Sequence, residues 1–364
     1  MSAPAPHHVA VLAGGKGTRF WPVGRASRPK QVLPLDGDDP RPLVRATYDR
    51  AVPLCDADGP WVVASKALGP TLARLLPARA RRRFLLEPQP RNTAAALAWT
   101  AIEVARAGAR GAVAVVPSDH HVAPEGAWRL AVRGMLDRAA ATGRILTLGL
   151  RPTFPATGYG YLEVGEARAE AAGGEVYAVT RFVEKPPRPA ANRYVKSGRF
   201  LWNLGTFAFR PDAFLAAMDV AFPEGAAAFA PVRASARPSP AKVAAAYRAV
   251  PSISVDYAVM EKAKDLEVLA ASFDWDDLGS WDAVARHATP DAAGNVAPAG
   301  TVAVDATDCF VRTEDGTTVA LLGVTDLVVV RTKDALLVAR RGRGEDVRRI
   351  HDELLRRGSD GLVS

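Results

Sequence analysis

Cysteine is scarce in this sequence, which contains only Cys55 and Cys309. The two lie far apart and in no spacing typical of a metal site, so we expect two reduced thiols, as in cytoplasmic proteins. Long hydrophobic runs are also absent. The first residues lack the basic segment and apolar stretch of a signal peptide, and charged residues interrupt the apolar stretches near 318–339. We therefore expect a cytoplasmic protein that does not associate with membranes.

A long block of one charge sign is missing too. Lys and Arg number 47 against 39 Asp and Glu, a formal net charge of +8, but the cations are dispersed. The densest group, at 79–83, is typical of a solvated basic face. We expect no nucleic-acid partner, because an enzyme that binds polyphosphates would show the same modest basic bias. A hydrophobic content of 48% in 364 residues indicates an ordinary folded protein with room for one large domain and a small appendage.

The first 150 residues alternate short apolar runs with helical periodicity. Alternation of this kind predicts right-handed crossovers and a Rossmann-like α/β fold: a mixed, mostly parallel sheet with helices on both faces. In such sheets, ligands bind beyond the carboxyl ends of the strands. We expect strands at 9–13, 61–65, 83–87, 112–116 and 144–150, and helices at 41–52, 67–76, 92–108 and 126–143. The third helix has Asn92 or Thr93 as a candidate N-cap and Gly108 as its stop.

The pattern changes twice more along the chain. From about 158 to 290, further strands between helices indicate an insertion that completes a pocket. After about 300, five closely spaced strand-like runs with no helical crossover predict a small all-β appendage, a short β-helix or roll, closed by a helix at 345–358. We therefore expect a catalytic domain at 1–292 and a small β-rich domain with a terminal helix at 298–364.

One loop near the start carries an unusual density of glycine. Residues 12–34 read LAGGKGTRFWPVGRASRPKQVLP. Glycine is costly in backbone entropy, so the chain must need positive φ or a close approach to the main chain here. The loop is not a P-loop, because its Lys lies inside the glycines and GxxxxGK[ST] is absent, and it fits a dinucleotide fingerprint poorly.

Phosphate binding explains the composition of this loop. The N–H groups of Gly14, Gly15 and Gly17 could form a nest for phosphate oxygens. Arg19 and Lys30 would neutralise the charge that accumulates when a phosphoryl bond is exchanged. The alternative is a tight turn with incidental cations.

Two acidic segments complete the candidate chemistry. PSDH at 117–120 follows a buried strand, which places Asp119 at a strand's carboxyl end. A carboxylate beside a polyphosphate loop suits Mg²⁺. FDWDDLGSW at 273–281 supplies three more carboxylates between aromatic residues. The alternatives are a turn-capping Asp119 and a solvated acidic loop.

Seven motifs in order resemble those of the sugar-nucleotide pyrophosphorylase family, within it the mannose-1-phosphate guanylyltransferases (GDP-mannose pyrophosphorylases). LAGGKGTRFWP with PKQ resembles the signature loop, and EPQPRNTAAA resembles the segment of the guanylyltransferase branch. The remaining motifs are TGYGYLE, FVEKP, WNLGTFAF, SVDYAVMEK and WDDLGSW. The resemblance covers roughly the whole chain and implies a nucleotidyltransferase fold with a β-helix-like appendage.

The resemblance also implies the reaction. GTP and mannose 1-phosphate would give GDP-mannose and pyrophosphate by in-line attack of the sugar phosphate, with Mg²⁺. The implied catalytic residues are Arg19, Lys30 and Asp119, and the metal ligands are Asp119 and Asp277, the latter preferred to Asp276 because it aligns with the family motif. The implied nucleotide-binding residues are Leu12, Ala13, Gly14, Gly15, Gly17, Thr18, Glu87, Arg91, Asn92, Thr93 and Ser118. The implied sugar-phosphate site comprises Gly158, Glu184, Lys185, Asn203 and Asp256.

Other functions are compatible with these motifs. The chain could use another hexose 1-phosphate or another nucleotide. It could instead be a non-catalytic, GDP-mannose-sensing regulatory homologue, although that class would be expected to lack the metal ligands or basic residues that are present here. We expect a homodimer. The sequence determines neither the strictness of specificity nor the purpose of the appendage.

Overall fold

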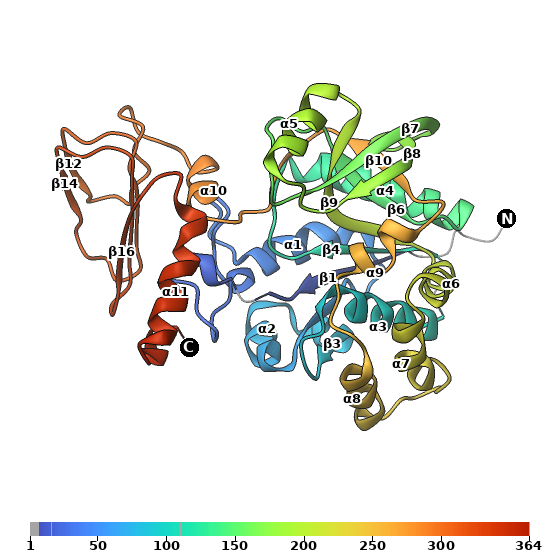
Figure 1. The fold of residues 1–364 in the computed structure, drawn as a ribbon. Helices are drawn as coiled ribbons and strands as arrows, with labels where there is room; N and C mark the ends of the chain where they lie inside the picture. Colours follow the sequence, from blue (N-terminus) through green and yellow to red (C-terminus); the bar gives the residue numbers. More distant parts are fainter. Residues whose placement is uncertain (1–6, 16, 109–110, 364) are drawn as a thin grey trace. The chain divides into compact units, whose positions relative to one another are not determined.

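The computed structural model describes residues 7–15, 17–108 and 111–363. It contains two compact units (Figure 1), each of which is assembled from segments that are distant in sequence. The first unit comprises Met1–Gly14, Thr47–Ser118 and Val122–Trp275. The second unit comprises Gly15–Ala46, Asp119–His121 and Asp276–Ser364. Residues 15–46 therefore belong to the same unit as the carboxyl-terminal strands, although more than half of the chain lies between them.

A nine-stranded mixed sheet forms the centre of the first unit. The strand order is β3-β2-β1-β4-β9-β6-β10-β8-β7, in which β3, β2, β1 and β4 run parallel and β6 pairs parallel with β10. Strands β7, β8 and β9 pair antiparallel with their neighbours. The strands are β1 (His8–Ala13), β2 (Trp61–Ser65), β3 (Phe84–Glu87), β4 (Val113–Pro117), β6 (Leu146–Leu150), β7 (Gly160–Ala171), β8 (Gly174–Val183), β9 (Phe200–Phe209) and β10 (Glu267–Ala271).

The five strands predicted in the first 150 residues are all present, because runs of Val, Ala and Leu are buried in the parallel part of the sheet. His8 begins β1 with its side chain buried. Three strands were not predicted: β10 of the large sheet, and the short strands β5 (His121–Ala123) and β11 (Asp274–Asp276), which pair with each other.

Helices cover both faces of the large sheet. On one face, α3 packs with α6, α7 and α8 over an apolar cluster that includes Val113 and Val115 of β4. Helix α4 packs against β4, β6, β9 and β10. The helices are α1 (Leu43–Ala51), α2 (Gly69–Leu75), α3 (Asn92–Arg106), α4 (Glu125–Thr142), α5 (Arg188–Ser197), α6 (Pro211–Ala221), α7 (Pro223–Arg233), α8 (Pro240–Ala249) and α9 (Val255–Ala258).

The ends of α3 only partly follow the prediction. Gly108, with φ of 79°, lies just beyond the helix, as expected for the left-handed residue that stops it. The predicted side-chain cap is wrong. Arg91 occupies the N-cap position with no capping hydrogen bond, and Asn92 itself has φ of 62°. The Asn92 side chain instead accepts a hydrogen bond from the adjacent Thr93 N–H at 2.8 Å.

The carboxyl-terminal part of the second unit is a coil of short strands. All five predicted runs form strands: β12 (Val302–Val304), β13 (Phe310–Thr313), β14 (Ala320–Leu322), β15 (Leu327–Arg331) and β16 (Leu336–Arg340). Parallel pairing joins β12 to β14 and β13 to β15, as successive turns of a β-helix do, and β16 adds antiparallel to β15. The helices are α10 (Trp281–Arg286) and α11 (Val347–Arg356).

The coil shares one apolar core with the segment that follows the glycine loop. Phe20 meets Trp281 edge to face with ring centroids 5.2 Å apart, and Trp281 meets Phe310 at 5.9 Å. The indole N–H of Trp281 donates to the Trp21 carbonyl at 3.1 Å. Val328, Val330, Leu337 and Val347 join this core from the strands and from α11. This common core explains why the second unit combines residues 15–46 with the coil.

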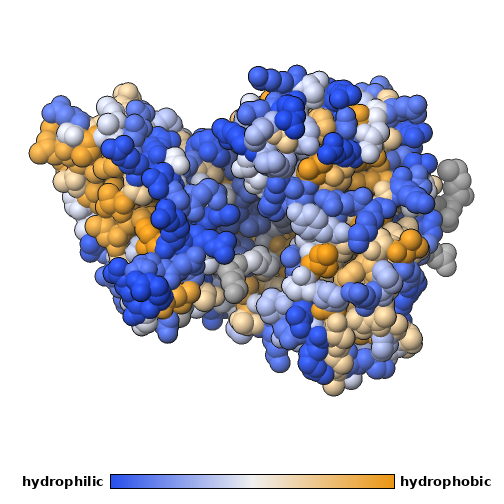
Figure 2. Space-filling model, viewed as in Figure 1, coloured by the Kyte–Doolittle hydropathy of each residue, from blue (hydrophilic) through white to orange (hydrophobic). Residues whose placement is uncertain are grey.

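The coil also exposes apolar side chains. Val302, Val304, Leu322, Leu336 and Val338 are all about half exposed or more, and Figure 2 shows hydrophobic patches over this part of the second unit. Among the described residues, no helix is long and apolar enough to cross a membrane.

We predict that Phe310→Ala destabilises the protein strongly. Phe310 is 4% exposed in the shared core, and removing a buried aromatic ring costs about 3–5 kcal/mol of unfolding free energy. Chemical denaturation followed by circular dichroism measures the change. The matched control is Leu322→Ala, on β14 of the same coil, where the side chain is 73% exposed and a change within about 0.5 kcal/mol is expected. Equal losses in the two variants would show that the shared core does not stabilise the fold.

Candidate functional site

Gly17 of the glycine loop is required by the close approach of Lys30. Gly15 and Gly17 have φ of 107° and 59°, a left-handed conformation that favours glycine. A Cβ on Gly17 would lie 2.6 Å from the backbone nitrogen of Lys30, so no other residue fits. Gly17 then leads into the short 3-10 helix η1 (Thr18–Phe20), and Lys30 begins a second, η2 (Lys30–Val32). The loop and Lys30 are thereby held together.

A cavity of about 590 Å³, here called the loop pocket, lies within the second unit. Six of the residues singled out from the sequence line it: Gly17, Thr18, Arg19, Lys30, Asp119 and Asp277. The other lining residues are Phe20, His120, Gly279, Arg348, His351, Asp352 and Leu355. The fold thus brings together basic and acidic residues that are separated by most of the chain.

Lys30 is the central cation of the loop pocket. Its Nζ lies 2.9 Å from Asp119 Oδ2 and also donates to the carbonyl of Asp277, with only 10% of the Lys30 side chain exposed. Burial by itself raises the pKa of Asp119, but the charges of Lys30 and His120 and the Lys30 hydrogen bond outweigh it and hold this pKa below its usual value. Asp119 is therefore ionised at neutral pH and can accept a cation.

Arg19, the second cation from the loop, pairs with a residue that the sequence analysis did not single out. Its Nε lies 2.8 Å from Glu345 Oε2, and both side chains are largely exposed. Glu345 precedes α11, in the carboxyl-terminal part of the chain. No local signal in the sequence connects it to the glycine loop, because only the shared core brings the two together.

Asp276 and Asp277 point to different surroundings. Asp276 is 5% exposed, accepts from the Leu278 N–H at 2.8 Å, and lies 2.5 Å from Arg286 Nη2 and 3.3 Å from His287 Nε2. Asp277 lines the loop pocket instead. Leu278 follows in the left-handed region, with φ of 46°. This turn directs one carboxylate inward and the next to the cavity.

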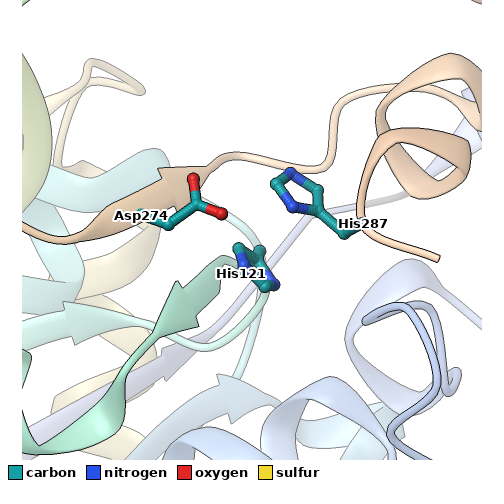
Figure 3. A group of neighbouring side chains, drawn as sticks. All are labelled: His121, Asp274 and His287. Atoms are coloured by element: carbon teal, nitrogen blue, oxygen red, sulfur yellow. The ribbon is translucent and has the colours of Figure 1, made fainter. Parts of the chain in front are cut away.

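His287, the imidazole partner of Asp276, stacks on His121. Figure 3 shows these two imidazole side chains, whose ring centroids are 3.8 Å apart. Nδ1 of His121 also hydrogen-bonds the carboxylate of Asp36. Asp274, also labelled in Figure 3, is part of the first unit. Within the second unit, Asp276 therefore holds a packed group of side chains in place, a structural role.

The segment that resembles the guanylyltransferase branch wraps around Tyr247 in the first unit. Gln89 and Arg91 both donate to the Tyr247 carbonyl, at 2.6 and 2.7 Å, and Thr93 Oγ1 accepts from the Val255 N–H at 2.9 Å. Glu87 ends β3, and its Oε1 has no hydrogen-bond partner among the described residues. Burial raises the pKa of Glu87 to about 7, although the Tyr247 hydroxyl favours the charged form.

The predicted sugar-phosphate residues form a second cluster in the first unit. Asn203 donates to Asp256 Oδ1 at 3.2 Å, and Lys185 Nζ lies 2.5 Å from Glu184 Oε1. A Cβ on Gly160 would meet Glu184 Oε2 at 2.6 Å and Asn203 Cβ at 3.2 Å, so both side chains border the space that this glycine leaves open. Burial, and then Glu184, raise the pKa of Asp256 to about 6.

The remaining predicted residues lie at the end of β1, directly after β4, or on the surface. Leu12 and Ala13 end β1, Gly14 follows, and the Leu12 carbonyl accepts from the Ser118 N–H at 3.0 Å. Ser118 is fully buried, and its Oγ has no hydrogen-bond partner among the described residues. Gly158 is exposed. The residues that the sequence analysis missed, Tyr247 and the α11 side of the loop pocket, become visible only through tertiary contacts.

Comparisons with known proteins agree with these motifs. A family model for nucleotidyl transferases matches residues 9–293, and one for a MannoseP isomerase/GMP-like beta-helix domain matches 300–354. The chain is 35% identical over 349 residues to the xanthan biosynthesis protein XanB of Xanthomonas campestris pv. campestris strain B100, covering 94% of this chain and 72% of that protein. It is 34% identical over 357 residues to the mannose-1-phosphate guanylyltransferase of Escherichia coli K12, with the same coverage of 94% and 72%.

A solved structure is similar over nearly the full length of both chains. The crystal structure of mannose-1-phosphate geranyltransferase from Thermus thermophilus matches with a TM-score of 0.85 and 35% identity, covering 96% of this chain and 99% of that one. The fold predicted from the sequence, a nucleotidyltransferase sheet with a small β-rich appendage, is confirmed.

We predict that Asp276→Asn lowers the free energy of unfolding by about 1–3 kcal/mol, since it removes the charge that Arg286 and His287 face. Hydrogen bonds from these residues depress the pKa of Asp276 despite its burial. A depressed pKa adds stability above the ordinary Asp pKa of about 4, and this stability is lost as pH falls further. Denaturation at several pH values should therefore show the largest wild-type advantage near neutrality. The matched control, Asp277→Asn, should lower the free energy of unfolding by less. A larger loss in Asp277→Asn than in Asp276→Asn would contradict the structural role of Asp276.

Proposed function

Because this chain belongs to the nucleotidyl transferase family, we propose that it transfers GMP from GTP to α-D-mannose 1-phosphate, giving GDP-mannose and pyrophosphate. The observation that carries the proposal is the loop pocket, in which Lys30, Asp119 and Asp277 meet beside the glycine loop. The motif order and the names of relatives such as the Escherichia coli guanylyltransferase support guanine and mannose as the specific groups.

The reaction requires alignment and charge neutralisation more than proton transfer. A sugar phosphate with a second pKa near ~6 is already ionised at neutral pH. One of its oxygens attacks the α-phosphorus of GTP, a new P–O bond forms, and the bond to the β-phosphate oxygen breaks as pyrophosphate leaves. Lys30 and Arg19 would stabilise the charge that shifts to the leaving group. A catalytic base is not needed.

Nucleotidyl transferases generally use a divalent metal, and the carboxylates of the loop pocket fit one. Asp119 is ionised and Asp277 lines the same cavity, and carboxylate oxygens are the ligands that Mg²⁺ prefers. We assign the metal as Mg²⁺, held by these two residues, where it would neutralise phosphate charge. The structural role of Asp276 supports the choice of Asp277 as the ligand.

Two groups of the first unit supply specificity in this proposal. The cluster of Glu184, Lys185, Asn203 and Asp256 would bind mannose 1-phosphate, with Gly158 nearby in the chain. Glu87, whose Oε1 has no hydrogen-bond partner among the described residues, would face the N–H groups of guanine. Arg91, Asn92, Thr93 and Ser118 belong to the nucleotide-binding residues, as do Leu12 to Gly15, Gly17 and Thr18. Their individual contacts remain predictions.

Several wider expectations also remain predictions from the sequence: the domains at 1–292 and 298–364, the homodimer and the cytoplasmic location. The non-catalytic regulatory alternative has less support, because Arg19, Lys30, Asp119 and Asp277 are all present.

A substrate matrix tests the proposal. Pyrophosphate release is measured for combinations of nucleoside triphosphates and hexose 1-phosphates, and GTP with mannose 1-phosphate should be the preferred pair. Asp119→Asn and Asp277→Asn should each reduce kcat by about 100- to 1,000-fold, as lost electrostatic stabilisation does, and excess chelator should abolish turnover. Turnover by a folded Asp119→Asn variant at the wild-type rate would refute the role of this carboxylate. A different preferred pair would replace the proposed substrates.

Lys30 and Lys185 should have separable kinetic effects. Lys30→Ala should reduce kcat by about two to three powers of ten, because it removes an interaction that strengthens in the transition state. Lys185→Ala should mainly raise KM for mannose 1-phosphate and leave KM for GTP nearly unchanged. Steady-state kinetics with each substrate varied in turn distinguishes the two. If Lys185→Ala weakened GTP selectively, the sugar-phosphate site would be misplaced.

A further inference from the structure

Helix α11 contributes one wall of the loop pocket. Arg348, His351, Asp352 and Leu355 line the cavity, and their spacing of three and four residues puts them on one face of the helix. The helix contacts η1 of the glycine loop directly. Val347 and Leu354 anchor it to the shared core, and Figure 2 shows hydrophilic residues along its outer surface. The carboxyl-terminal helix is therefore part of the pocket in which the phosphate chemistry is proposed.

Arg348 is more loosely paired than Arg19 and Lys30, the other Lys and Arg residues among the described lining of the loop pocket. Lys30 lies 2.9 Å from Asp119, and Arg19 lies 2.8 Å from Glu345. Within the part of the chain that the structure describes, Arg348 has one long ion-pair contact, 3.9 Å from its Nε to Asp352 Oδ2, and its side chain is 66% exposed. Because exposed pairs of this kind contribute little, an incoming anion can draw Arg348 away from Asp352 at small cost.

We propose that Arg348 binds the pyrophosphate end of GTP and the pyrophosphate that leaves. This inference rests on the proposed function. The residues assigned to the sugar phosphate all belong to the first unit, whereas Arg348 shares its cavity with the glycine loop and Lys30. A guanidinium also presents two parallel N–H donors, which match the oxygens of a phosphate group. Phosphate oxygens would at the same time compete with Glu345 for Arg19.

The reverse reaction tests this assignment, since pyrophosphate and GDP-mannose can be varied separately. Arg348→Gln should raise KM for pyrophosphate by about tenfold and leave KM for GDP-mannose unchanged, because a charge-assisted contact to one substrate is lost. The matched control is Arg349→Gln, which removes the same charge from the next residue. Arg349 lies 3.8 Å from Asp346 and lines a different cavity, so KM for pyrophosphate should stay at the wild-type value.

Calorimetric titration with inorganic pyrophosphate and Mg²⁺ separates this inference from the proposed function. Suppose that the wild-type protein has no activity but binds pyrophosphate, and that Arg348→Gln binds it about tenfold more weakly whereas Arg349→Gln does not. This result would defeat the proposed reaction but support the Arg348 site. Arg348→Lys should restore part of the affinity. The Arg348 assignment is overturned if the wild-type protein binds no pyrophosphate, or if Arg348→Gln binds it as tightly as the wild type does. It is also overturned if Arg348→Gln and Arg349→Gln weaken binding equally, since that would indicate only a general effect of net charge.

Discussion

The packing of Phe20 against Trp281 is the contact on which the second unit depends. It joins the segment after the glycine loop to a residue that lies more than 250 positions later in the chain, and Trp21 reinforces it through a hydrogen bond to the same indole. Lys30 and Asp277 flank this contact in sequence, ten residues after Phe20 and four before Trp281. Their meeting in one cavity therefore follows from an apolar core, since charged residues alone gain little by finding each other at a surface.

Electrostatic balance is the second property of the loop pocket. In the structure, carboxylates from the protein face the cations that the proposed reaction would direct at phosphates: Asp119 faces Lys30 and Glu345 faces Arg19. Such pairing satisfies charges that would otherwise be costly to bury. The two pairs differ in burial, because Lys30 is almost enclosed whereas Arg19 and Glu345 are exposed. A ligand can therefore replace Glu345 more readily than it can separate Lys30 from Asp119.

Buried carboxyl groups mark the two candidate binding clusters of the first unit. Burial raises the pKa of Glu87 to about 7, against a hydrogen bond with Tyr247. Burial, and then the charge of Glu184, raise the pKa of Asp256 to about 6, against the charge of Lys185 and a hydrogen bond from Asn203. Groups with perturbed pKa values are enriched at functional sites. Asp276, by contrast, forms ion pairs with Arg286 and His287.

The sequence by itself determined most of the regular elements and the chemistry of the loop. The runs of Val, Ala and Leu predicted the parallel strands, the close spacing after 300 predicted the coil, and the motifs around Lys30, Asp119 and Asp277 predicted a phosphate site. These features depend on local composition and on the types of residue that stand near one another in the chain.

Tertiary structure decided which of these segments belong together. The grouping of residues 15–46 with the coil, the different orientations of Asp276 and Asp277, the wrapping of residues 89–93 around Tyr247, and the α11 wall with Glu345 and Arg348 all arise from contacts between distant segments. The physical reason is that a local sequence pattern specifies which face of a helix or strand is apolar. The element against which that face packs depends on how the apolar faces of the whole chain are buried together.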